Sequence, residues 1–217
     1  MHEYAIFVQA RLGSTRFPKK ILQKIAGKRV LDHVLDSCNE TGYKVFLLTP
    51  ELEKDFFVEH FNVEVFGGSE NDVLSRFLHC AEKFNVKNIV RITSDCPCLP
   101  SSHISAVIEE HKKNQDKFVT NVAYENIEGS YRSITNIPDG FDVEVFSYEI
   151  LKNANDDSKN SKDREHVTSW MRKNLPIFIP RFFLTLEGKF SLDTLEDLHK
   201  IEKNFSFLKS LKTIITL

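Results

Sequence analysis

Cations and hydroxyl side chains gather directly after the first apolar run of the sequence. Residues 4–8 (YAIFV) form a short apolar run that is typical of a buried parallel strand and too short for a helix. Residues 9–20 then contain Gly13 and six side chains suited to a polyanion: Arg11, Ser14, Thr15, Arg16, Lys19 and Lys20. Backbone N–H groups near Gly13 and Ser14 can face phosphate oxygens, and the cations can neutralise a triphosphate. The pattern predicts a phosphate-binding loop; a basic loop with its charges in water is the alternative.

A carboxylate follows another apolar run. Asp95 comes shortly after residues 88–92 (NIVRI), and ligands of open α/β sheets gather at the carboxyl ends of strands. We therefore expect Asp95 close to the first loop. Mg²⁺ prefers hard oxygen ligands and accompanies triphosphates, which favours a metal-binding role for Asp95 over that of a helix cap or turn residue.

Apolar strand-like runs alternate with helical patterns along the whole chain. This alternation predicts an α/β fold, a three-layer, doubly wound and mostly parallel sheet. Strands are expected at 4–8, 44–48, 63–66, 88–92, 118–122 and 141–146, and helices at 30–38, 51–60, 71–84, 102–113, 163–173 and from 194 onward. The polar run at 153–162 is predicted to be a mobile loop, and 177–186 to be extended. We expect one domain over residues 1–217, with an irregular excursion from the sheet at about 123–139.

Bulk composition limits the classes of partner. The net charge of −2 argues against a general nucleic-acid or membrane surface, so we expect no nucleic acid and no membrane as partners. No apolar stretch reaches the length of a membrane span, and the chain runs into its first strand without a signal peptide. The four cysteines lack paired zinc-type spacings, so reduced thiols and a cytoplasmic location are expected.

The first loop is neither a Walker A loop nor a GxGxxG dinucleotide fingerprint. Its sequence, QARLGSTRFPKKIL, resembles the QARxGSTRxPGKxL opening of the cytidylyltransferase family, which includes acylneuraminate and KDO cytidylyltransferases. The similarity is greatest to the spore-coat polysaccharide branch, although Lys19 replaces the usual glycine. The resemblance implies a nucleotide-diphosphosugar transferase fold (GT-A-like), catalytic roles for Arg11, Lys20 and Asp95, and a nucleotide-binding loop of Gln9, Ala10, Arg11, Gly13, Ser14, Arg16 and Lys20.

Two further segments resemble the metal-binding motifs of that family. Residues 91–97 (RITSDCP) resemble RITGDCP, in which the acid binds the catalytic magnesium; this is Asp95 here. Residues 192–198 (LDTLEDL) resemble (V/I)DTPEDL, whose first acid is the second metal ligand and corresponds to Asp193. Two acids from distant parts of a chain are typical of a Mg²⁺ pair, so Mg²⁺ is the expected cofactor. Glu196 and Asp197 are also explained by the first turn of a helix, where acids favour the dipole.

Three more segments resemble the substrate pockets of the family. Residues 68–77 (GSENDVLSRF) resemble GSExDVLxRF, which lies under nucleobase and ribose and implicates Ser69, Asp72 and Arg76. Residues 138–146 (PDGFDVEVF) and 163–168 (DREHVT) resemble segments that line the acceptor pocket. They implicate Asp142, Glu144, Arg164, Glu165 and His166. Without the resemblance, other interpretations remain open. Ser69 would be an ordinary helix cap, and Asp142 and Glu144 would lie on the solvent-facing side of a strand. His166 would be a buried structural histidine.

All of these segments occur in the family's order between Tyr4 and Leu198. The resemblance implies transfer of CMP from CTP to a small acidic acceptor, a sugar acid or phosphorylated metabolite, with release of pyrophosphate, in polysaccharide biosynthesis. It also implies a homodimer formed through the excursion, whose expected apolar side chains are Val122, Tyr124, Ile127, Tyr131, Ile134 and Ile137. Use of another nucleotide, and a nucleotide-binding partner protein without catalysis, are the alternatives.

Overall fold

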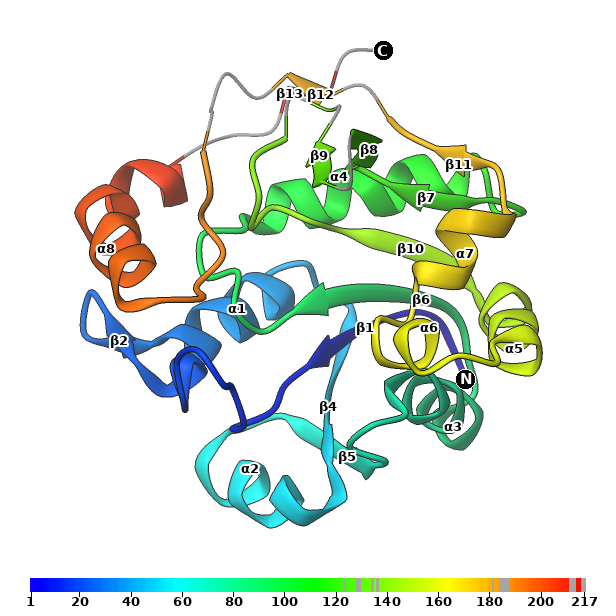
Figure 1. Ribbon diagram of the computed structural model, residues 1–217, viewed down its shortest axis with the longest axis horizontal. Helices are drawn as coiled ribbons and strands as arrows, with labels where there is room; N and C mark the ends of the chain where they lie inside the picture. The colour runs from blue at the N-terminus through cyan, green and yellow to red at the C-terminus, as the bar shows by residue number, and fades with distance from the viewer. Residues whose placement is uncertain are drawn as a thin grey trace.

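A seven-stranded sheet forms the centre of the computed structural model (Figure 1). The structure describes residues 1–122, 124–127, 130–133, 135, 137–180, 182–183, 188–210 and 214–215, with backbone only at 124–127, 130–133, 182–183 and 214–215. The strand order is β11 (Ile177–Phe178), β7 (Phe118–Thr120), β10 (Glu144–Ser147), β6 (Val86–Thr93), β1 (His2–Gln9), β4 (Lys44–Pro50) and β5 (Glu64–Gly68). Only β10 runs antiparallel to its neighbours in this sheet. The predicted mostly parallel α/β fold is confirmed.

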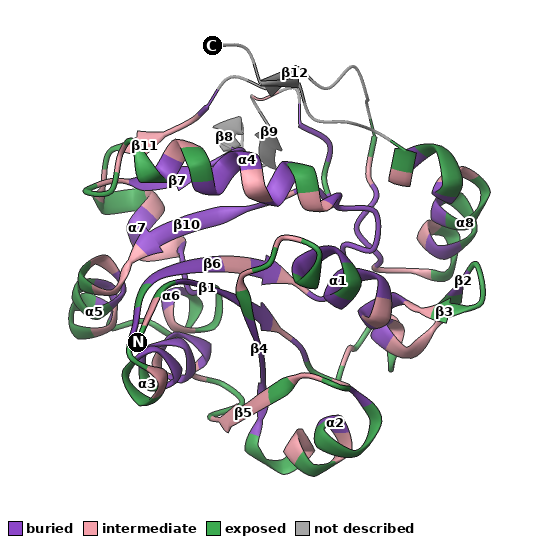
Figure 2. Ribbon diagram, turned by 180° about the vertical axis from the view of Figure 1, so that it is seen from behind, coloured by how far each residue is buried: buried purple, intermediate pink, exposed green. Residues whose placement is uncertain are grey.

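Helices cover both faces of the sheet because its strands are apolar on both sides. In β1, Ile6 and Val8 face one core cluster while Ala5 and Phe7 face the other, as the two-residue period of a strand requires. The first cluster includes residues of α1 (Val30–Asn39), α4 (Ser101–Lys112) and α8 (Leu195–Ser210). The second includes α3 (Val73–Phe84), α5 (Tyr148–Asp157) and α7 (Ser169–Asn174). Figure 2 shows the buried strands between helices whose outer sides are exposed.

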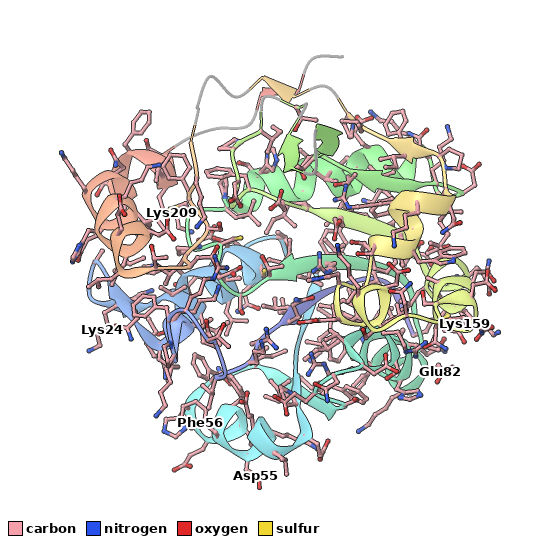
Figure 3. The ribbon with its side chains drawn as sticks, viewed as in Figure 1. Lys24, Asp55, Phe56, Glu82, Lys159 and Lys209 are labelled. Atoms are coloured by element: carbon pink, nitrogen blue, oxygen red, sulfur yellow. The ribbon has the colours of Figure 1, made fainter. Side chains whose placement is uncertain are left out.

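Short elements complete the edges. The 3-10 turn η2 (Glu51–Glu53) leads into α2 (Lys54–His60) beside β5. A second 3-10 turn, η1 (Lys20–Leu22), is followed by a ribbon of β2 (Lys24–Ile25) and β3 (Lys28–Arg29), which the sequence pattern did not predict. The turn of this ribbon places Ala26 and Gly27 at positive φ, as a two-residue hairpin turn requires. Figure 3 labels Lys209 at the end of α8. Its Nζ donates a 2.6 Å hydrogen bond to Ser37 Oγ of α1.

Two predictions for residues 153–173 were wrong. Half of the expected polar loop, residues 153–157, is the second half of α5. Ser147 caps that helix by accepting from Ile150 N–H, and Leu151 and Ala154 are buried. The expected single helix at 163–173 is two helices, α6 (Ser161–Glu165) and α7, separated at Val167, whose φ of 57° cannot continue a right-handed helix.

The excursion contains the antiparallel pair β8 (Tyr124–Ile127) and β9 (Ser130–Ser133), outside the main sheet. Of the apolar side chains expected there, Val122 and Ile137 are buried in the core of this chain and do not face a partner. The side chains of the other four lie outside the described residues. A further short pair joins β12 (Phe182–Phe183) to β13 (Ile214–Ile215). No helix within the described ranges is long and apolar enough to cross a membrane.

Candidate active site

A cavity opens at the carboxyl ends of β1 and β6, where Gln9 and Thr93 are register partners. Such ends are where open α/β sheets bind ligands. The structure brings twelve of the predicted site residues to this cavity: Gln9, Ala10, Arg11, Gly13, Ser14, Arg16, Lys20, Arg76, Asp95, Glu165, His166 and Asp193. Their contacts with a ligand stay predictions. Five predicted residues lie outside its lining: Ser69, Asp72, Asp142, Glu144 and Arg164.

Two hydrogen bonds donated by backbone N–H groups fix the loop after β1, which lines the cavity. The N–H of Leu12 donates to Glu53 Oε2 of η2 at 2.8 Å, and the N–H of Lys19 donates to the carbonyl of Leu12 at 3.0 Å. A Cβ added at Gly13 would meet no heavy atom within 4 Å, so the loop leaves open space beside its backbone. Lys19 has φ 55° and ψ 30°, the left-handed conformation that favours glycine. This accounts for the glycine that the cytidylyltransferase pattern has at that position.

Lys20 joins the two predicted metal-binding acids. Its Nζ donates to Asp95 Oδ2 at 2.6 Å and to Asp193 Oδ1 at 3.0 Å. Arg16 and Lys189 also contact Asp193, each at 3.0 Å. Burial opposes ionisation of Asp193, but the hydrogen bonds and charges of Lys20 and Lys189 outweigh it and lower its pKa to about 2. Burial likewise opposes the charge of Lys20, and the two acids reverse that effect and raise its pKa.

Backbone contacts bring Asp193 to Asp95. The N–H of Leu192 donates to the carbonyl of Asp95 at 2.8 Å, and the N–H of Phe190 donates to that of Asp139 at 2.7 Å. Gly140, at φ 97°, permits this approach, because a Cβ there would lie 2.5 Å from the backbone of Phe190. The segment before α8 is therefore fastened to the loop after β6.

The two acids suit a magnesium ion. A single atom, Lys20 Nζ, contacts both carboxylates, so both can also reach one small cation. Mg²⁺ is commonly bound by one or two carboxylates together with substrate phosphates, and the loop beside them carries the cations predicted to bind phosphate. Among the described residues, no group of three or more histidine, cysteine or acidic side chains could hold a metal by itself. The site thus fits a magnesium ion that arrives with a nucleotide.

Arg76 is a buried cation with unused hydrogen-bond donors. It is 3% exposed, and its Nε and Nη1 have no hydrogen-bond partner among the residues that the structure describes. Burial and the nearby charge of Arg11 lower its pKa to about 10. An unpaired buried guanidinium is costly, and Arg76 also lines the cavity, so a ligand with acceptor atoms would relieve this cost.

Arg164, Asp72 and Ser69 hold the cavity's surroundings together and do not line it. Arg164 Nε donates to Asp72 Oδ2 at 2.7 Å, and its other donors bind the carbonyls of Asn155 and Ser158 and the amide oxygen of Asn155. Asp72 also caps α3 by accepting from Ser75 N–H, and Ser69 accepts from Asp72 N–H. The sequence predicted that these three side chains bind substrate. In the structure their polar groups form hydrogen bonds with other residues of the protein instead.

Glu144 and Asp142 also differ from the sequence prediction. Glu144 is 2% exposed and pairs with Arg91 and Arg172, whose charges overcome its burial and lower its pKa. Glu144 therefore neither faces solvent nor is accessible to an acceptor substrate. Burial, with the charges of Asp139 and Glu144, raises the pKa of Asp142 to about 7.

Glu165 and His166 form the opposite wall, at the end of α6. Both are exposed, so His166 is not a buried structural histidine. Glu165 Oε1 lies 3.8 Å from Arg11 Nη2, which links this wall to the loop after β1. The predictions omitted Glu70, Thr93 and Ser94, which also line the cavity. Each of the three had a signal in the sequence: Glu70 is the glutamate of the GSExDVLxRF resemblance, and Thr93 and Ser94 directly precede Asp95 at the end of a strand.

Residues 5–212 of the chain match the family model described as Cytidylyltransferase. The chain is 30% identical, over 93% of its length, to an uncharacterized protein of Methanocaldococcus jannaschii, covering 84% of that protein. It is 26% identical to the spore coat polysaccharide biosynthesis protein SpsF of Bacillus subtilis, over 93% of this chain and 86% of that one. A 3-deoxy-manno-octulosonate cytidylyltransferase of Glaesserella parasuis is 31% identical over 54% of this chain and 48% of its own length.

Solved structures share the fold. A cytidylyltransferase from Leptospira borgpetersenii aligns with a TM-score of 0.77 at 24% identity, over 98% of this chain and 99% of that chain. A CMP:2-keto-3-deoxy-manno-octonic acid synthetase complexed with CTP aligns with a TM-score of 0.71 at 13% identity, over 94% and 99%. At these identities the likeness establishes the fold alone.

Proposed function

Because this chain belongs to the cytidylyltransferase family and is a CTP-dependent nucleotidyltransferase, we propose that it transfers CMP to a small acidic acceptor. An acceptor oxygen attacks the α-phosphorus of CTP in line, the new O–P bond forms, and the bond to the β-phosphate oxygen breaks to release pyrophosphate. Such a transfer depends on positioning and charge neutralisation and needs no covalent enzyme intermediate. The observation that carries the proposal is the convergence of Lys20, Asp95 and Asp193 beneath the phosphate-binding loop.

In this proposal the cations of the loop hold the triphosphate. Arg11 and Arg16 are more than half exposed at the cavity and can exchange their contacts with Glu165 and Asp193 for the β- and γ-phosphates. Lys20 stabilises the charge that develops during transfer. Asp95 and Asp193 would hold Mg²⁺, which when bound neutralises phosphate charge. Arg76 and Gln9 contact the nucleoside.

The acceptor is proposed to be a sugar acid or a phosphorylated metabolite. Glu165 and His166 line the wall across from the loop, and His166 can bind an anionic group there. The similarity to a spore coat polysaccharide biosynthesis protein and to a 3-deoxy-manno-octulosonate cytidylyltransferase supports a role in surface polysaccharide synthesis. We propose that the reaction takes place in the cytoplasm.

We further propose a homodimer in which the β8–β9 hairpin meets its copy. The hairpin stands outside the main sheet and its sequence carries Tyr124, Ile127 and Tyr131, more apolar surface than an isolated ribbon exposes to water. Light scattering at micromolar concentration tests the assembly, and a monomer would refute it.

A pyrophosphate-release assay tests the reaction. The four nucleoside triphosphates are each combined with a panel of acidic sugars and phosphorylated metabolites, with Mg²⁺ present. We expect release with CTP and one acceptor class, and loss of most turnover in Asp95→Asn, since a missing metal ligand costs several kcal/mol of transition-state stabilisation. Release with a different nucleotide, or undiminished turnover in the folded Asp95→Asn variant, would contradict the proposal.

A further inference from the structure

A buried network of charges lies behind the part of the cavity formed by Gln9. At its centre is Glu144, which accepts hydrogen bonds from Arg91 Nη1, from Arg172 Nη2 at 2.5 Å and from Thr168 Oγ1 at 2.9 Å. The Arg91 and Arg172 side chains are 14% and 22% exposed, so little water competes for these contacts. Charge-assisted hydrogen bonds in such surroundings hold the side chains in one arrangement.

This network fixes the orientation of the Gln9 carboxamide. Arg91 Nε donates to Gln9 Oε1 at 3.0 Å, and a guanidinium has donors only, so Gln9 must present its oxygen to Arg91. The amide NH₂ group is consequently turned away from Arg91. No residue in the described part of the chain accepts a hydrogen bond from it, and Gln9 lines the cavity. The cavity therefore has a donor at Gln9 that cannot become an acceptor while Arg91 is in place.

Arg76 presents the same kind of group to the same cavity. Its Nε and Nη1 are buried without a partner, and an arginine has no acceptor to offer. Gln9 lies at the end of β1 and Arg76 on α3, so two separate elements bring donors to one space. The ligand group that fits there must carry acceptor atoms.

We propose that the Arg172–Glu144–Arg91 network is a positioning device that makes Gln9 specific for cytosine. Cytosine presents two neighbouring acceptors, N3 and O2, whereas uracil carries a hydrogen on N3. The fixed NH₂ group of Gln9 can donate a hydrogen bond to N3 or O2 of cytosine. With uracil in the same position, the N3–H group would face this donor, and a buried site penalises two donors that face each other. The inference rests on the proposed function only in taking a cytidine nucleotide as substrate.

The test uses Gln9→Glu, which keeps the oxygen for Arg91 and replaces the NH₂ donor with an acceptor. Binding of CMP and UMP to the full chain is measured by calorimetry, because the two differ only in the base and lack the groups held by the loop. We expect CMP to bind about tenfold more weakly and the preference for CMP over UMP to fall at least as much. Gln115→Glu makes the same change at an exposed site away from the cavity and should alter neither affinity.

A second variant, Arg91→Met, removes the guanidinium donors that face Gln9 Oε1 and leaves Gln9 intact. The Gln9 amide can then rotate and present its oxygen to the cavity, so the affinity for UMP should rise relative to that for CMP. The circular dichroism spectrum should remain that of the wild-type fold. Retention of the full preference for CMP in Gln9→Glu would overturn the inference, and so would an unchanged preference in the folded Arg91→Met variant. A wild-type protein with no preference for CMP would instead contradict the proposed function, and the inference with it.

Discussion

Lys20 donates a 2.6 Å hydrogen bond to Asp95, and the same ammonium group contacts Asp193. This ammonium group lies between the two carboxylates that we propose to hold magnesium. The lysine thus competes with a metal until a triphosphate offers it other anions.

Replacing this cation should favour metal binding while harming catalysis. In Lys20→Met, we expect Mn²⁺ to bind at least tenfold more tightly without nucleotide, measured by electron paramagnetic resonance, because two close carboxylates lose their competing charge. Turnover should fall at least a hundredfold because stabilisation of the phosphate charge is lost. The exposed Lys24→Met is the matched control. Unchanged Mn²⁺ affinity in Lys20→Met would show that the lysine does not occupy the metal's place.

Arg11 should distinguish nucleotides by their phosphates. Its side chain is 56% exposed and has one weak contact, 3.8 Å from Glu165, so Arg11→Ala should leave the fold intact. We expect CTP to bind about tenfold more weakly, since the partner charges are on the β and γ groups. CMP, which lacks them, serves as the control in calorimetry and should change less than twofold. Equal weakening of both would place Arg11 at the nucleoside.

Arg164 should matter more to stability than to substrate binding. It connects α3, α5 and α6 through Asp72, Asn155 and Ser158. In Arg164→Lys the forked contacts are lost, so the free energy of unfolding should fall by about 1 to 3 kcal/mol in urea titrations. The KM for acceptor should change less than twofold. A tenfold rise in that KM with unchanged stability would restore the acceptor role that the sequence predicted.

Asp142 should make stability depend on pH. Its pKa is raised to about 7, above the value of an unfolded chain, so the folded state holds the proton more tightly. This contribution to stability is complete below about pH 4 and is lost as pH rises through 7. We expect Asp142→Asn to remove this slope and to gain about 1 to 2 kcal/mol over wild type at pH 8. Parallel urea-stability profiles for the two proteins between pH 4 and 8 would contradict the assignment.

Replacement of Lys19 by glycine should stabilise the protein. Its left-handed backbone costs an L-residue about 1 kcal/mol, and glycine avoids most of that while gaining freedom in the unfolded chain. Lys19→Gly should therefore raise the free energy of unfolding by about 0.5 kcal/mol. Lys19→Ala removes the same charge but keeps the Cβ, and should show no gain. If both variants behave alike, the charge of Lys19 and not its backbone sets the stability.

The sequence predicted those features that depend on local pattern. Apolar runs such as 4–8 and 88–92 located the strands, and the residues that follow them, Arg11 and Asp95, were placed correctly at the cavity. It could not predict the partners of Glu144, because Arg91 and Arg172 are 53 and 28 residues away and only the folded sheet brings them together. Helix α5 was missed since only Leu151 and Ala154 of its residues are buried, too few for a periodic signal.

The hydrogen bond from Leu192 N–H to the Asp95 carbonyl has a consequence for the synthesis of the protein itself. One carboxylate of the proposed metal pair emerges from the ribosome long before the other, and only docking of the segment ahead of α8 brings them together. Strands β1, β4, β5 and β6 and the loop after β1 all precede Asp193 in the chain, so a nascent chain made only that far has one of the two proposed metal ligands. If both acids hold the metal, we expect chains that end before Asp193 to turn over little CTP, so that truncated products leave the nucleotide unspent.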